Sequence, residues 1–134
     1  MKPSEQPRQS ARRARETRRE LASVILAATF PAATADQVAR AAGDLCRVGQ
    51  AFRRQRTGAD ARAEDRLAEL HAKAERGALA CAGQGGSIDG EGVVIAPGGR
   101  FFRAELRDGH AGRAAYLLSS ALPGADRARG VAIY

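Results

Sequence analysis

The sequence predicts an α+β fold in which N-terminal helices, including a helical hairpin, pack with a small antiparallel β-sheet. Apolar residues recur at helical spacing up to residue 77, and the apolar pattern alternates beyond residue 92. Glycine is dense between these two parts. The 134 residues suit one domain, which we expect over residues 11–134 after a disordered lead-in over residues 1–10.

The first predicted helix is basic and covers residues 11–30. No helix-breaking residue interrupts this segment before Pro31. Leu21 and Ile25 share an apolar stripe with two alanines, whereas the first half of the segment is almost purely charged. Such a helix can be anchored by its C-terminal half while its arginines project into solvent or onto a ligand.

A helical hairpin is predicted over residues 35–77, a segment that ends on a glycine. Thr34 and Gln37 have the spacing of a capping box, which marks the start of the first helix. That helix is expected to end at Gly58, and Asp60 can cap the next one. A link this short makes the two helices antiparallel. Four side chains should face one another across the hairpin: Leu45, Val48, Leu67 and Leu70.

A Gly-rich linker over residues 78–92 leads to a β-rich part over residues 93–134. The segment 93–95 is β-branched, a Pro-Gly-Gly turn follows, and apolar residues then alternate with charged ones, which predicts a β-hairpin. Residues 112–122 fit a short helix or a third strand, and a helix is the preferred interpretation. The last four residues can add an edge strand.

All of the net charge lies in the first half of the chain. Residues 1–58 hold 12 Lys and Arg against 5 Asp and Glu, whereas residues 59–134 hold 10 of each kind. Nearly all of the basic residues are arginines, whose planar, permanently charged group matches phosphate and carboxylate geometry. The candidate binding residues are Arg12, Arg13, Arg15, Arg18, Arg19, Arg40, Arg47, Arg53, Arg54 and Arg56.

Two kinds of anionic partner fit these arginines. One is nucleic acid or a ribonucleoprotein complex, bound through its phosphates. The other is an acidic protein surface, which an inhibitor or adaptor protein would meet. Arginine serves both, so the sequence leaves this alternative and the oligomeric state open. Readers of base edges would also need polar amides beside the arginines, and only Gln50 and Gln55 qualify.

No constellation of side chains predicts catalysis, a metal or another cofactor. Cys46, His71, Cys81 and His110 are candidate zinc ligands, but none of them forms a closely spaced pair. No carboxylate pair suggests acid–base chemistry. The segment 100–103 interleaves arginine with phenylalanine, and strand alternation should send one ring into the core and leave the other beside Arg103 as an ordinary surface residue. The alternative is that one ring stacks a base on an exposed sheet face. We therefore expect a binding protein and no enzyme.

The cysteine content favours two reduced thiols and a location in the bacterial cytoplasm. Alternatively, Thr17 to Leu21 resembles a twin-arginine export motif, followed by a short apolar run and a small-x-small cleavage site at residues 33–35. An exported protein could carry one disulfide between its two cysteines. No segment approaches the roughly 20 apolar residues of a membrane span, so no membrane partner is expected.

The stretch DGEGVVIAPGGR at residues 89–100, after a helical pair that carries Leu-Cys-Arg at residues 45–47, resembles small accessory proteins of proteobacterial phages and integrated elements. Their β-hairpin carries an Asp-Pro-x-Gly, Val-rich, Pro-Ser-Gly-Arg pattern. The match covers residues 38–103, departs at Gly90 and Gly98, and lacks the usual aromatic-Gly ending. The resemblance implies a phage or mobile-element origin without assigning functional residues. By analogy with such small proteins, it suggests anti-CRISPR-like inhibition of host defence complexes as a function.

Overall fold

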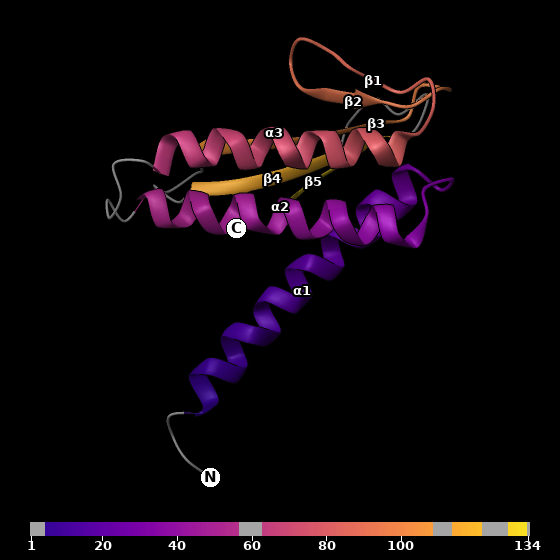
Figure 1. Ribbon diagram of the computed structural model, residues 1–134. Helices are drawn as coiled ribbons and strands as arrows, with labels where there is room; N and C mark the ends of the chain where they lie inside the picture. Colours follow the sequence, from indigo (N-terminus) through magenta and orange to yellow (C-terminus); the bar gives the residue numbers. More distant parts are fainter. Residues whose placement is uncertain (1–4, 57–62, 109–113, 122–128, 134) are drawn as a thin grey trace.

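The computed structural model describes residues 5–56, 63–108, 114–121 and 129–133. These ranges contain three helices and five strands, which are shown in Figure 1. The helices are α1 (Glu5–Thr29), α2 (Ala35–Arg56) and α3 (Ala63–Ala82). The strands are β1 (Ser87–Ile88), β2 (Val93–Ile95), β3 (Phe101–Asp108), β4 (Ala114–Ala121) and β5 (Arg129–Ala132). The strands form one antiparallel sheet in sequence order, so the predicted α+β class is confirmed.

The helices cover one face of the sheet. The predicted hairpin of α2 and α3 is present, with α2 against β4 and α3 against β1 and β2. Only the C-terminal half of α1 joins this layer, and its N-terminal half projects away from the body of the protein (Figure 1). The strand residues that point toward the helices are buried: Val94, Phe102, Ala104, Tyr116 and Leu118.

The hydrophobic core is built largely from small side chains. Leu45, Val48 and Leu67 are buried and Leu70 packs against the same cluster, which confirms the predicted packing of the helical hairpin. Alanines from all three helices fill the space between these larger side chains. Small side chains let the helices approach closely but bury little apolar area each, so a few large residues carry most of the hydrophobic stabilisation.

The start of α2 is the capping box that the sequence predicts. The Gln37 backbone N–H donates to Thr34 Oγ1 at 3.1 Å, and the Thr34 backbone N–H donates to Gln37 Oε1 at 2.9 Å. Two helix-terminal donors that would otherwise lack partners are thereby satisfied. The predicted boundary residues Gly58 and Asp60 lie outside the described residues.

Helix α1 begins earlier than the sequence suggests. Residues 5–10, which were expected to belong to a disordered lead-in, form the first turns of the helix. Pro7 does not prevent this, because it lies in the first turn, where backbone N–H groups have no partner within the helix.

Helix α3 continues through Gly77, where the sequence was expected to end it. A Cβ atom at Gly77 would lie 3.3 Å from the Ala41 Cα atom, so this glycine permits close packing of α3 on α2. The helix ends at Ala82, and Gly83 follows in the left-handed conformation with a φ of 79°. Part of the predicted linker, residues 78–82, is therefore helical, and residues 87–88 form β1.

The preferred helix over residues 112–122 is wrong, because residues 114–121 form strand β4. This strand pairs along its whole length with β3, and Tyr116 and Leu118 point into the core while Leu117 and Ser119 point outward. Alternating burial of this kind is satisfied only by a strand. The hairpin of β2 and β3 is confirmed, and the predicted edge strand is present as β5.

Candidate functional site

One side of α1 changes character halfway along the helix. Ala22, Leu26 and Phe30 recur at four-residue spacing and are buried against the rest of the protein. Continued toward the N-terminus at steps of three or four residues, the same row carries Arg19, Arg15 and Arg12, which are exposed. Half of the helix is therefore anchored by apolar packing, while the other half holds a row of arginines on the side that faces α2.

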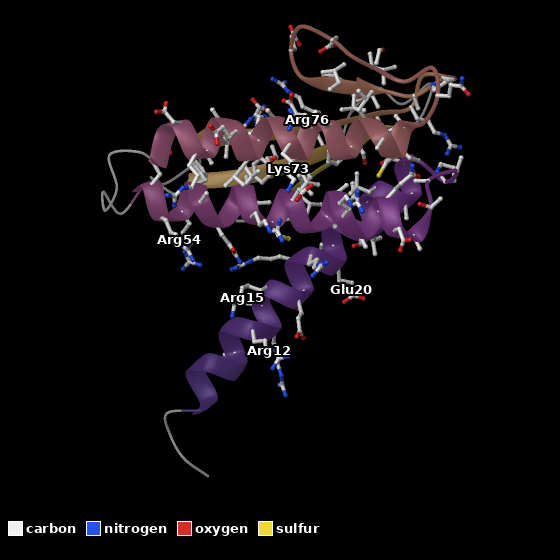
Figure 2. All side chains as sticks on the ribbon, in the orientation of Figure 1. Arg12, Arg15, Glu20, Arg54, Lys73 and Arg76 are labelled. Atoms are coloured by element: carbon white, nitrogen blue, oxygen red, sulfur yellow. The ribbon has the colours of Figure 1, made fainter. Side chains whose placement is uncertain are left out.

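These arginines line a groove between α1 and α2. Its first part has a volume of about 380 Å³, and an adjoining part of about 360 Å³ shares Arg19, Gly43 and Arg47 with it. We call these two parts together the α1/α2 groove. Figure 2 shows Arg12 and Arg15 on the projecting half of α1, and Arg54 on the side of α2 that is turned toward it. The basic residues that line the groove are Arg12, Arg15, Arg19, Arg40, Arg47 and Lys73.

The side chain of Arg19 approaches α2 at Gly43, in the middle of that helix. Its Nη2 atom lies 3.5 Å from the position that a Cβ atom of Gly43 would occupy, which is an ordinary contact distance. A larger side chain at this position would displace the guanidinium or fill the groove.

The six basic residues of the groove face two carboxylates among its described lining residues, Glu16 and Asp44. The lining therefore carries an excess of four positive charges. Glu16 is 3.4 Å from Arg12 in an exposed pair, which contributes little stability. Asp44 is only 6% exposed and lies 3.6 Å from Arg47 and 3.9 Å from Lys73. Cations from α1 and α2 thus face each other with incomplete compensation, an arrangement that favours an anion between them.

Cys46 lies at the floor of the groove but is not an activated nucleophile. Burial raises the pKa of its thiol, and the nearby charges of Arg19 and Arg18 offset only part of that rise. Burial also raises the pKa of the Cys81 thiol. Both cysteines are free and buried, so the structure contains no disulfide between them.

The other predicted arginines are not all gathered at this site. Arg13 and Arg53 are exposed but do not line the groove as described. Arg18 and Arg54 take part in further interactions within the protein, and the side chain of Arg56 lies outside the described residues. Sequence reasoning missed Lys73, which α3 brings beside Asp44. Sequence reasoning also passed over Asp44, although its spacing to Arg40 and Arg47 places all three residues on the same side of the helix.

A second polar cluster joins α3 to the sheet. His71 Nε2 lies 2.9 Å from Glu75 Oε1, and His71 Nδ1 lies 3.1 Å from the hydroxyl oxygen of Tyr116. In the neutral imidazole Nε2 therefore carries the proton that the carboxylate accepts, and Nδ1 accepts from the tyrosine. Tyr116 is fully buried, and burial followed by the charge of Glu75 raises its pKa. Both ring nitrogens of His71 have partners within the protein, so the imidazole is not available as a base for a substrate. The cluster instead links α3 to strand β4.

The aromatic segment at the start of β3 follows the expected alternation. Phe102 is buried, with its ring edge-on to that of Phe30 at a centroid distance of 6.4 Å. Phe101 is half-buried on the opposite face of the sheet, where Arg103 pairs with Glu105 at 3.7 Å. Arg103, which shares this face of the sheet with Phe101, is thus already paired with a carboxylate.

The described residues contain no group of three or more side chains that could hold a metal ion, and His110 lies outside them. None of the helices in the described ranges is long and apolar enough to cross a membrane. Comparisons with protein-family models, curated proteins and solved structures give no match. The resemblance to phage accessory proteins remains a prediction from sequence motifs, and the function has to be argued from the groove itself.

Proposed function

We propose that this protein is a non-enzymatic nucleic-acid-binding protein that contacts phosphates through the α1/α2 groove. The observation that carries the proposal is the convergence of arginines from two helices on one groove with an excess of positive charge. Arginine forms charge-assisted, often bidentate hydrogen bonds with phosphate. A chain of phosphates would replace the repulsion between the arginines of α1 and those of α2 by attraction to both.

The length of the arginine row favours a polymer. Arg12 and Arg19 are seven residues apart, which corresponds to about 10 Å along a helix, so the row can meet more than one phosphate. The cations of the groove are accessible to such a polymer, since the side chains of Arg12, Arg47 and Lys73 are 78%, 64% and 54% exposed. A phosphate backbone is charged continuously along its length and can meet the whole row, whereas an acidic protein surface has to place carboxylates at matching positions.

The packing of α1 supports action in the cytoplasm of the bacterial host. Cleavage at residues 33–35, as an export leader would require, would remove Ala22, Leu26 and Phe30 from the core. Cleavage after residue 35 would also remove Thr34, which caps α2. The phage or mobile-element origin rests on the sequence resemblance alone.

The proposal is tested by the salt dependence of nucleic-acid binding. Fluorescence anisotropy with labelled mixed-sequence oligonucleotides should give a dissociation constant below ~1 μM at physiological salt, tighter than ordinary non-specific binding. For three to five phosphate contacts, log K should fall with log salt concentration with a slope of about −2 to −4.

Weak binding to every nucleic acid would contradict the proposal. In that case, a pull-down from the bacterial host with and without nuclease should recover an acidic protein in both samples, as the inhibitor or adaptor alternative expects. If nucleic acid is the partner, nuclease treatment should instead remove the captured material.

A further inference from the structure

We infer that the α1/α2 groove holds two successive phosphates of one nucleic-acid strand in neighbouring subsites that Arg19 joins, with little dependence on the bases. This inference rests on the proposed function and names the part of the ligand that is recognised. Three observations carry it: the cations that line each part of the groove, the position of Arg19 between the parts, and the composition of the described lining.

Each part of the groove has enough positive charge for a phosphate of its own. Four cations and one carboxylate line each part, so each carries an excess of three positive charges. A phosphate of a nucleic-acid backbone carries one negative charge. Because the two parts adjoin, the phosphates that they attract should be neighbours along one strand. The cations are Arg12, Arg15, Arg19 and Arg47 in the first part, and Arg19, Arg40, Arg47 and Lys73 in the second.

Arg19 lies where the two parts meet. It lines both of them, as does Gly43, and its guanidinium is in contact distance of Gly43. A guanidinium has five N–H donors in a planar fork, so one arginine can donate to two neighbouring phosphates. Arg47 also lines both parts, but its Nη1 atom already faces Asp44 at 3.6 Å. Arg19 is therefore the cation best placed to join the two subsites.

The buried carboxylate of Asp44 orders two cations of the second part before a ligand arrives. Arg47 and Lys73 lie 3.6 Å and 3.9 Å from the same oxygen atom of Asp44, Oδ1. Their side chains remain 64% and 54% exposed, so both stay open to a phosphate. Restricting long side chains in advance lowers the entropy cost of binding.

The lining offers little that could read a base. Its described residues include no aromatic ring on which a base could stack, and Gln50 is the one amide among them. Of the two carboxylates, Glu16 lies 3.4 Å from Arg12, and Asp44 is buried. The affinity should therefore come from the phosphates. Because arginine can also contact guanine, the test uses a strand that has no bases.

The test compares a 12-nucleotide strand of mixed sequence with a strand of 12 abasic sugar-phosphate units, titrated by fluorescence anisotropy. Two variants are measured beside the wild type: Arg19→Gln, at a residue that lines both parts, and Arg40→Gln, at a residue of the second part. Each removes one positive charge from an exposed position on a helix. Both variants should keep the fold, which circular dichroism and thermal melting would verify.

We expect the wild type to bind the abasic strand within about fivefold of the mixed-sequence strand at the same salt concentration, because the phosphates are unchanged. Arg19→Gln should weaken the binding of both strands by about tenfold or more, since hydrogen bonds to two phosphates are lost. The loss should exceed that in Arg40→Gln by at least about threefold, although both variants lose the same charge.

Two results would overturn the inference and leave the proposed function standing. One is a loss beyond that fivefold range when the bases are removed, which would show that the groove reads bases. The other is an equal loss in Arg19→Gln and Arg40→Gln, which would show that Arg19 does not join two subsites. Failure of the wild type to bind either strand would overturn both the inference and the proposed function.

Discussion

Replacing Arg12, Arg15, Arg19 and Arg47 together by alanine should lower the affinity for a single strand by a factor of at least ~10³ at physiological salt. A hydrogen bond to a charged group contributes about 1.5–3 kcal/mol, and each lost phosphate contact also removes about 0.7 from the salt slope for a single strand. All four residues line the first part of the groove. Anisotropy titrations across a salt series measure both quantities.

A matched control separates the groove from general positive charge. Replacing four arginines outside the groove changes the net charge equally and should leave the affinity within about threefold. The control residues are Arg13, Arg53, Arg76 and Arg107. Equal losses in the two variants would show that charge acts without regard to position, contrary to the site described. The groove variant removes like charges that face each other, but the loss of Arg47 leaves the buried carboxylate of Asp44 with Lys73 alone among the described cations, so thermal melting of both variants has to verify the fold.

Leu45→Ala should destabilise the protein by about 3–5 kcal/mol. Leu45 lies on α2, is 0% exposed and belongs to the hydrophobic core cluster. Because many surrounding residues are alanines, few side chains are large enough to relax into the cavity. Such a loss is a large part of the stability of an ordinary domain, about 5–15 kcal/mol.

Urea denaturation measures this loss as a lower transition midpoint with an unchanged slope. Leu21→Ala is the control, because Leu21 is 41% exposed on α1 and its truncation should cost less than about 1 kcal/mol. A Leu45→Ala cost below 1 kcal/mol would mean that the packing of α2 differs from the structure.

The elements that could be predicted from the sequence are those with local causes. The Thr34–Gln37 capping box is a local hydrogen-bond pattern, and it forms as expected. Gly77 was misinterpreted because its role is tertiary: it lets α3 approach Ala41 of α2. Residues 114–121 have helix-forming alanines and leucines, but pairing with strands on both sides decides their conformation.

The candidate site was predictable in its charge and not in its geometry. The sequence identifies the arginine-rich segments, since composition alone shows them. Which of these arginines face one another depends on how α1 packs against α2, which brings the Arg19 side chain to Gly43. Lys73 joins the site only because α3 packs beside α2, a contact that no local pattern encodes, whereas Asp44 could have been found from its i,i+3 spacing to Arg47.

The most direct test of the groove is to map where a strand binds. In an NMR titration of ¹⁵N-labelled protein with an unlabelled 12-nucleotide strand, the largest chemical-shift changes should fall on residues 12–19 and 43–50, including the amide of Gly43. The signals of Phe101 and Arg103, on the sheet face away from the helices, should stay unchanged. Shifts concentrated on that sheet face, or shifts of similar size over the whole protein, would contradict binding in the α1/α2 groove.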